Sequence, residues 1–276
     1  MLTLRWIGNT TVPVEAECIT ADRLADLPVA DIERLAVQHG NRQEPMAEFF
    51  HVSGDGADGR IRLEGSMSRV KWVGAGMSGG EISVDGEIGT HLGSEMAGGR
   101  ITVTGNAGDW VGAEMRGGLI QVHGNAGHQV GAAYRGSRRG MRGGTILIHG
   151  SAGNEIGSTM RRGLIAIGAA AGDFAGVSMI AGSVFLFGSP GIRVGAGMKR
   201  GTIAVLDAGS GAGPINLLPT FQFECEYRPT FMQLFLRYLR GLEFPVDETI
   251  LEGKYTRYCG DQVALGKGEI LIWQPS

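Results

Sequence analysis

Arginines placed at regular intervals are the residues of this sequence best suited to bind an anion. They fall in two groups: Arg116, Arg142 and Arg161 each follow a methionine of a repeated unit, and Arg135, Arg138 and Arg139 lie in a seven-residue insertion, 134–140. Like charges stacked on neighbouring units repel one another unless water or an anion neutralises them. Guanidinium groups also pair bidentately with carboxylates. The arginines therefore predict either a solvated edge of turns or a surface that holds a carboxylate-rich chain or an acidic partner.

Histidines and cysteines offer no complete catalytic or metal-binding set. His123 and His149 occupy equivalent positions of neighbouring units, so we expect their rings to stack, but the adjacent units hold threonine and alanine there. The third ligand that a zinc site requires is therefore missing. Cys18, Cys225 and Cys259 lie far apart and form no CxxC pair, which argues against a disulfide framework or an iron–sulfur site. We expect no active site, no metal and no cofactor bound by this chain alone.

One further polar position recurs through the repeat. Thr90, Asp109, His128, Asn154 and Asp173 occupy it in successive units. Because these residue types both donate and accept hydrogen bonds, the position predicts a hydrogen-bonding ladder rather than an acid/base pair.

Glycine and methionine define the repeat that must position these side chains. The 276 residues include 48 glycines, and methionines recur every 19 residues, or after 26 where the insertion lies: Met77, Met96, Met115, Met141, Met160, Met179 and Met198. The unit reads G-x-x-G-x-x-x-G-x-x-M-x-G-G-x-I-x-V-x-G and is clearest from Gly105 to Gly124. Its I-x-V segment alternates apolar and polar residues, as does a strand with one buried face. The flanking glycines suit turns with positive φ.

The repeat predicts a mainly β fold, a right-handed parallel β-helix of about eight 19-residue coils with the methionines stacked inside. The inward strand pairs are Ile61/Leu63, Ile82/Val84, Ile101/Val103, Ile120/Val122, Ile146/Ile148, Ile165/Ile167, Val184/Leu186 and Ile203/Val205. The same register runs through the uncharged stretch Phe174–Ile192, which argues against a membrane span there. The GxGxxG match Gly74–Gly79 lacks the strand–helix context of a dinucleotide site.

Residues 1–54 do not follow the repeat, and we expect them to form a small α/β cap on its first coil. Strands are predicted over Leu2–Ile7 and Val12–Ile19. A helix is predicted over Asp31–His39, with Asp31 as its N-cap and Gly40 after its end. The repeat itself is assigned to residues 55–208.

Residues 209–276 are expected to form a second, helix-containing cap or a docking segment. The segment begins with a loop, Gly209–Pro214, and ends with a strand within Gln262–Trp273. Between them Pro229 and Thr230 open an amphipathic helix to about Arg240, with one face composed of Phe231, Leu234, Phe235, Tyr238 and Leu239. Terminal coils expose unpaired strand edges, so capping is the simpler role of both ends.

Charge and targeting signals are weak. The formal net charge is −3, which points neither to nucleic acid nor to a membrane surface. Arg5 interrupts the apolar core that a secretory signal peptide would need, and the scattered cysteines suit a reducing compartment. We therefore expect a cytoplasmic protein.

The ends of the chain resemble one known family more closely than the repeat alone does. The repeat is similar both to the carboxy-terminal β-helix domain of the glutamate synthase large subunit and to the C subunit of formylmethanofuran dehydrogenase, with its bacterial counterpart in the formyltransferase/hydrolase complex of methylotrophs. Four segments resemble the second family: Leu2–Leu4, Leu35–Arg42, Phe49–Gly54 and Tyr255–Asp261, the last followed by Gly266–Glu269. Arginine outnumbers lysine 21 to 4, which suggests a GC-rich genome and favours the bacterial complex.

This resemblance implies a non-catalytic scaffold subunit in a hetero-oligomer. The implied partners are an amidohydrolase-like, a molybdopterin-subunit-like and a formyltransferase-like subunit, which together convert formyl-tetrahydromethanopterin through formylmethanofuran to formate. Methanofuran-type cofactors carry a glutamate-rich tail, for which Arg116, Arg135, Arg138, Arg139, Arg142 and Arg161 are the candidate contacts. The alternatives are a subunit of a redox formylmethanofuran dehydrogenase, a stand-alone glutamate synthase module, and a polysaccharide-cleaving β-helix enzyme, for which the sequence offers no persuasive carboxylate pair.

Overall fold

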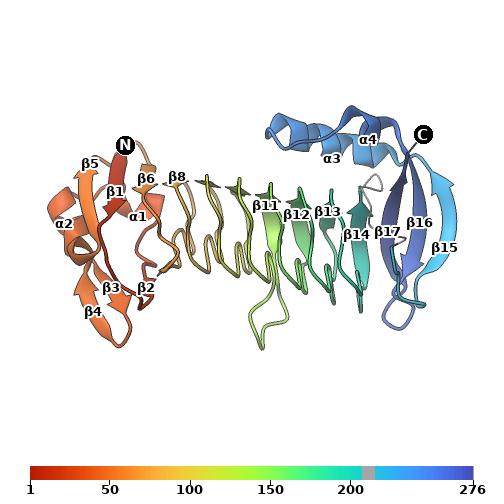
Figure 1. Ribbon diagram of the computed structural model, residues 1–276, viewed down its shortest axis with the longest axis horizontal. Helices are drawn as coiled ribbons and strands as arrows, with labels where there is room; N and C mark the ends of the chain where they lie inside the picture. Colours follow the sequence, from red (N-terminus) through yellow and green to blue (C-terminus); the bar gives the residue numbers. More distant parts are fainter. Residues whose placement is uncertain (207–214, 276) are drawn as a thin grey trace.

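The computed structural model describes residues 1–206 and 215–275 and shows a mainly β chain drawn out into a long row of strands (Figure 1). Thirteen strands form one large sheet in which most neighbours are parallel, and four short strands form a second sheet. The loop predicted over Gly209–Pro214 and the boundary predicted between residues 208 and 209 lie outside the described residues.

The predicted repeat strands are confirmed as successive parallel members of the large sheet. They are β6 (Arg60–Glu64), β8 (Glu81–Asp85), β9 (Arg100–Val103), β10 (Leu119–Val122), β11 (Arg142–Ile148), β12 (Arg162–Ile167), β13 (Ser183–Leu186) and β14 (Arg200–Val205). Equivalent residues of neighbouring units pair, so Ile120 lies between Ile101 and Ile146. A second parallel ladder of single bridges runs from Met67 to Pro190. We call the segment from one repeat strand to the next a coil.

Apolar side chains fill the space that the coils enclose. All seven repeat methionines, and strand residues such as Ile146 and Ile148, are completely buried. Each such side chain stabilises the fold by about 1.5–3 kcal/mol. Close stacking of the coils depends on glycine: Gly99 has a φ of +86°, and a Cβ there would lie 2.6 Å from the carbonyl oxygen of Gly80 in the preceding coil.

The N-terminal segment continues the large sheet beyond the first coil. β1 (Leu2–Trp6) pairs in parallel with β6 and antiparallel with β5 (Phe50–Gly54), which confirms the first predicted strand. The second predicted strand is reduced to β2 (Val14–Glu15). It belongs to the small sheet with β3 (Ala36–His39), β4 (Arg42–Pro45) and β7 (Val70–Lys71), and three short helices accompany it: α1 (Ala21–Leu24), α2 (Val29–Glu33) and the 3-10 helix η1 (Met46–Glu48).

The helix predicted over Asp31–His39 is wrong. α2 begins directly after Pro28 and ends at Glu33, and the residues that follow form the β3–β4 hairpin. Gly40, with a φ of +62°, begins the two-residue turn of that hairpin instead of following a helix end. A glycine with positive φ serves either purpose, so the local pattern did not distinguish the two structures.

The C-terminal segment closes the other end of the sheet. β17 (Lys267–Gln274) pairs in parallel with β14, and β16 (Lys254–Gly260) and β15 (Gln222–Tyr227) follow as antiparallel strands. The predicted last strand is therefore present, although it begins at Lys267 and not at Gln262. The predicted helix is confirmed as α3 (Thr230–Gly241), and a short α4 (Glu248–Glu252) comes after it.

α3 lies back over the later coils and covers the outer face of the sheet from β10 onward (Figure 1). Its buried residues Met232, Leu236 and Leu239 pack in one apolar cluster with Leu147 and Phe185 of the repeat strands. The predicted apolar face is only partly correct, because Leu239 is buried whereas 70% of Leu234 and 49% of Tyr238 are exposed. The helix is apolar on more than one side, and the side that packs on the sheet is the one with Met232, Leu236 and Leu239.

Candidate functional site

Three of the predicted basic residues, Arg116, Arg142 and Arg161, lie at one corner of the row, where each coil turns into its strand. Arg116 and Arg161 precede strands β10 and β12 and are exposed. Arg142 begins β11 and pairs in register with Arg162 at the start of β12. The coils therefore bring Arg116, Arg142 and Arg161 onto consecutive levels, as the sequence predicts, and Lys199 lies two coils further on. We call the following set the basic corner: Arg116, Arg142, Arg161, Arg162, Lys199 and Arg200.

Arg116 is the one predicted member that forms an ion pair within the described residues. Its Nη2 lies 2.6 Å from Oε2 of Glu95, a residue of the preceding coil, and both side chains are about half exposed. An exposed pair of this kind contributes about 0.2–1 kcal/mol. Glu95 directly precedes Met96, so the repeat register contained the signal for this contact, which the sequence analysis missed.

Arg142 has the most unusual environment in the basic corner. Its Nε is buried and has no hydrogen-bond acceptor among residues 1–206 and 215–275. A buried donor without an acceptor is costly, more so when it belongs to a charged group. An acceptor supplied from outside the chain would remove that cost, so Arg142 fits an anionic contact better than Arg116 does.

The insertion 134–140 leaves the row on the side away from α3 (Figure 1). Its three arginines are exposed. Its first residue, Tyr134, is tied to the two preceding coils. The backbone N–H of Tyr134 donates to Glu114 Oε1 at 3.2 Å, its hydroxyl donates to Ser94 Oγ at 2.8 Å, and that hydroxyl lies 3.1 Å from His91 Nδ1. The base of the insertion is therefore fixed.

A row of aromatic rings from three consecutive coils supports Tyr134. The ring centroids of Trp72 and His91 lie 4.1 Å apart and almost parallel, and His91 and Trp110 follow at 6.1 Å. The ring of Tyr134 lies 5.0 Å from Trp110 and 6.0 Å from Trp72. These four residues, the aromatic row, were missed by the sequence analysis, although positions 72, 91 and 110 are 19 residues apart.

The aromatic row is uncharged near neutral pH. Burial, and secondarily the Lys71 ammonium, lower the pKa of His91 to about 4, while Asp109 acts in the opposite direction. Burial raises the pKa of Tyr134 to about 12. His91 is therefore a neutral hydrogen-bonding and stacking group rather than a general acid.

The predicted hydrogen-bonding ladder is confirmed for Asp109, His128, Asn154 and Asp173, whereas no side-chain hydrogen bond within the described part of the chain places Thr90 in it. Asp109 Oδ1 accepts from the backbone N–H of His128 at 2.7 Å, and His128 Nδ1 accepts from that of Asn154 at 2.9 Å. Asn154 Oδ1 accepts from the N–H of Asp173 at 3.0 Å. Each side chain thus satisfies a backbone donor of the next coil, which holds the coils in register.

Histidine and cysteine show no metal-binding or nucleophilic arrangement in the part of the chain that the structure describes. His123 and His149 lie on neighbouring coils as expected, with ring centroids 4.6 Å apart. The described part of the chain contains no group of three or more His, Cys, Asp or Glu placed to hold a metal ion. Cys259 donates its S–H to Glu224, and burial together with this hydrogen bond raises the pKa of the thiol to about 11. At neutral pH it is a thiol and a poor nucleophile.

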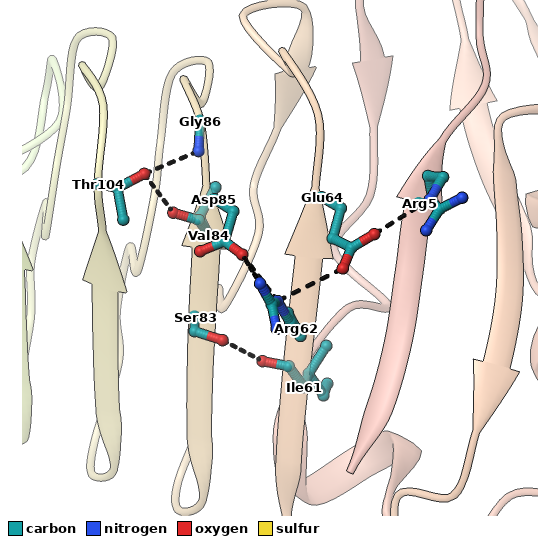
Figure 2. A network of polar contacts seen from close by, with 9 residues as sticks. All are labelled: Arg5, Ile61, Arg62, Glu64, Ser83, Val84, Asp85, Gly86 and Thr104. Atoms are coloured by element: carbon teal, nitrogen blue, oxygen red, sulfur yellow. Dashed lines mark hydrogen bonds and ion pairs between the residues drawn. The ribbon is translucent and has the colours of Figure 1, made fainter.

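The outer face of the first coils is charged, but its charges neutralise one another (Figure 2). Arg5 Nε donates to Glu64 at 3.0 Å, and Arg62 Nε donates to Asp85 at 2.7 Å while also facing Glu64. This network joins β1, β6 and β8 and pairs both Arg5 and Arg62 with carboxylates. No helix among the described residues has the length and apolar character to cross a membrane.

Comparison with known proteins identifies the family. No protein-family model matches the chain. The C subunit of the formyltransferase/hydrolase complex Fhc from Methylorubrum extorquens is 53% identical to it over 272 residues, which cover 99% of each chain. The chain belongs to the family of Fhc C subunits. A chain in the crystal structure of the Fhc complex FhcABCD from the same species, in complex with methylofuran, superposes over 99% of both chains with a TM-score of 0.88 and 36% identity.

Archaeal relatives match a shorter stretch. The C subunit of molybdenum-containing formylmethanofuran dehydrogenase 1 from Methanothermobacter thermautotrophicus is 46% identical over 83 residues. These residues are 30% of this chain and 21% of that protein, so the match spans about a fifth of the relative. The resemblance to this family is thus confirmed, and it is the bacterial Fhc protein that matches along the whole chain.

Proposed function

We propose that this chain is the non-catalytic structural subunit of a formyltransferase/hydrolase complex that converts formyl-tetrahydromethanopterin through formylmethanofuran to formate in one-carbon metabolism. The observation that carries this proposal is the correspondence over 99% of the length with the C subunit of an Fhc complex, in both sequence and structure. The partners would be the amidohydrolase-like, molybdopterin-subunit-like and formyltransferase-like subunits, and the compartment the cytoplasm.

The architecture suits a rigid scaffold. The parallel strands and the second ladder of bridges support a right-handed parallel β-helix over residues 55–208, with an α/β cap at 1–54 and a helix-containing cap at 209–276. Both ends of the large sheet continue into non-repeating strands. Such a stack presents long surfaces against which partner subunits can pack.

The basic corner and the insertion are the surfaces that we assign to anionic contacts. Arg116, Arg135, Arg138, Arg139, Arg142 and Arg161 would hold the carboxylate-rich tail of a methanofuran-type cofactor or an acidic partner. The buried Nε of Arg142 without an acceptor in the described chain supports this assignment, and the Arg116–Glu95 pair weakens it for Arg116. A methanofuran-type group supplies the carrier of the formyl unit when it is bound in the complex.

Two other functions fit less well. A redox formylmethanofuran dehydrogenase would be expected to give archaeal relatives matched along the whole chain, whereas the match to the one from Methanothermobacter thermautotrophicus is confined to 83 residues. A stand-alone glutamate synthase module would not explain the correspondence of both caps with the Fhc protein.

Native purification of the tagged chain from its source tests the proposal. We expect the three partner types to co-purify, identified by mass spectrometry, and the eluate to form formate from formyl-tetrahydromethanopterin. Recovery of the chain with a flavoprotein and a glutamine amidotransferase, or alone, would contradict it. The tagged variant Arg34→Gln, changed at an exposed residue of the N-terminal cap, serves as the control and should recover the same partners.

A further inference from the structure

The insertion 134–140 has the construction of a protein-recognition loop. Arg135, Arg138 and Arg139 are exposed and form no ion pair with any described residue. Their charges are therefore available to a partner, unlike that of Arg116, which Glu95 pairs. Three such guanidinium groups within five residues create a local positive field on a chain whose net charge is −3.

The loop is held in place before any partner arrives. Its backbone closes on itself, because Ser137 N–H donates to Tyr134 O at 2.9 Å and Arg139 N–H donates to Ser137 Oγ at 3.3 Å. Gly140 N–H donates to the carbonyl of Thr159 on the next coil at 3.2 Å. With Tyr134 fixed at one end and Gly140 at the other, little conformational entropy remains to be lost on binding.

The support under Tyr134 is built from strained residues. Trp72, His91 and Trp110 have φ values of +67°, +66° and +66°, in the left-handed region that favours glycine. The fold places this conformation at the same point of each coil, and a glycine or asparagine would adopt it at lower cost. The conformation recurs on the later coils at Gln129, Glu155, Phe174 and Arg193, so it belongs to the repeat as a whole. The coils that Tyr134 contacts differ because three consecutive rings occupy it and form a platform.

The shape of the loop indicates the class of ligand. Small-molecule sites are concave and enclose their ligand, whereas this loop projects away from the row (Figure 1). A flexible carboxylate chain would lie along the basic corner, where Arg142, Arg161 and Lys199 follow the surface of the coils. A projecting loop with outward arginines instead suits a complementary depression on a folded protein.

We propose that the insertion 134–140 is a preorganised docking loop that inserts its arginines into a carboxylate-lined surface of a partner subunit, and that Tyr134 is its positioning residue. This inference rests on the proposed membership of a multi-subunit complex. It assigns different ligands to two positively charged surfaces: the loop binds protein, and the basic corner binds the anionic chain of the cofactor.

The test is reconstitution of the four-subunit complex from purified subunits with two matched triple variants. The first carries Arg135→Glu, Arg138→Glu and Arg139→Glu in the loop, and the second carries Arg161→Glu, Arg162→Glu and Lys199→Glu in the basic corner. Assembly affinity and cofactor content per assembled complex are measured for each. We expect the loop variant to lose roughly tenfold in assembly affinity with unchanged cofactor content, and the corner variant to assemble normally.

Unchanged assembly of the loop variant overturns the proposal, as does normal assembly with loss of cofactor, which would assign the loop to the anionic chain. A wild-type chain that never assembles would refute the proposed function itself, and this inference with it. Glutamine at the three loop positions removes charge without reversing it, and should give a smaller loss and a shallower dependence of affinity on salt.

Tyr134→Phe tests the positioning role. It keeps every charge but removes the hydroxyl that contacts Ser94 and His91. We expect assembly to weaken severalfold with an unchanged salt dependence, because the number of charges at the interface is the same. Assembly identical to that of the wild type would show that the hydroxyl does not position the loop.

Discussion

The hydroxyl of Tyr134 donates a hydrogen bond to Oγ of Ser94, 2.8 Å away and two coils earlier in the row. Ser94 is completely buried, so this contact carries a side chain of the insertion down to the wall of the coils. The insertion 134–140 is thereby anchored to the regular part of the fold. The backbone from which its three arginines extend is fixed at Tyr134.

Replacing Tyr134 should lower stability in two measurable steps. Tyr134→Phe leaves Ser94 without the donor and should reduce the free energy of unfolding by about 1 kcal/mol. Tyr134→Ala also removes the ring from the aromatic row and should cost about 2 kcal/mol. Urea unfolding measures both, with Arg135→Ala, one residue further along, expected to be neutral. Equal stability of the phenylalanine variant and the wild type would show that the hydrogen bond has no net value.

Lowering the pH should weaken the fold through His91. Its pKa is about 4 in the folded chain and 6.5 in the ordinary state, so the unfolded chain binds the proton first as the pH falls. The free energy of unfolding therefore decreases between about pH 6.5 and pH 4. Solvent screening of this partly buried ring limits the total loss to about 1 kcal/mol. Lys71 strengthens the effect and Asp109 opposes it.

The comparison that isolates this contribution is His91→Gln, because glutamine already occupies the equivalent left-handed position as Gln129. Stability is measured by urea unfolding across the pH range, and the variant should show a flatter dependence than the wild type. Parallel curves for the two proteins would mean that His91 does not titrate in this window.

Substitutions at two glycines distinguish the cost of backbone strain from the cost of a steric clash between coils. Gly99 and Gly76 both have positive φ, but a Cβ at Gly99 would meet the Gly80 carbonyl at 2.6 Å whereas one at Gly76 would meet nothing within 4 Å. Gly76→Ala should cost about 1 kcal/mol from strain alone. Gly99→Ala should cost several times more, about 3 kcal/mol or above, because backbone must move. Thermal unfolding of the two variants decides this, and equal losses would mean that the coils separate easily.

The buried methionine stack should dominate stability over the basic corner. Met115→Ala opens a cavity at a fully buried site and should cost about 2–5 kcal/mol. Arg116→Ala, the next residue, breaks only the exposed pair with Glu95 and should cost at most about 1 kcal/mol. Both are measured by urea denaturation under the same salt. A larger loss for Arg116 than for Met115 would contradict the assignment of the interior.

Most strands of the large sheet could be predicted from the sequence. The 19-residue period places the strand residues, the turn glycines and the buried side chains at the same time. Ile101, Ile120 and Ile146 pair as predicted, since shifting any coil by one residue would expose its apolar set. Outside the repeat this constraint is absent. Gly40 fits a helix end and a hairpin turn equally well, and only the pairing of β3 with β4 decides between them.

The candidate site was predictable to a smaller extent. The repeat places the basic corner on consecutive coils, but the Arg116–Glu95 pair and the seating of Tyr134 depend on how side chains from different positions of neighbouring coils meet. The exposure of Leu234 likewise depends on which side of α3 packs against the strands. These contacts join residues at different positions of the repeat unit. A sequence period shows only which residues occupy the same position in successive units.

The most direct test of the scaffold role is formate production by complexes reconstituted with and without this chain, alongside the chain alone. We expect no turnover of formyl-tetrahydromethanopterin by the isolated chain, full turnover by the complete complex, and a large loss when this chain is left out. Turnover by the isolated chain, or undiminished activity of the other subunits in its absence, would contradict the scaffold role.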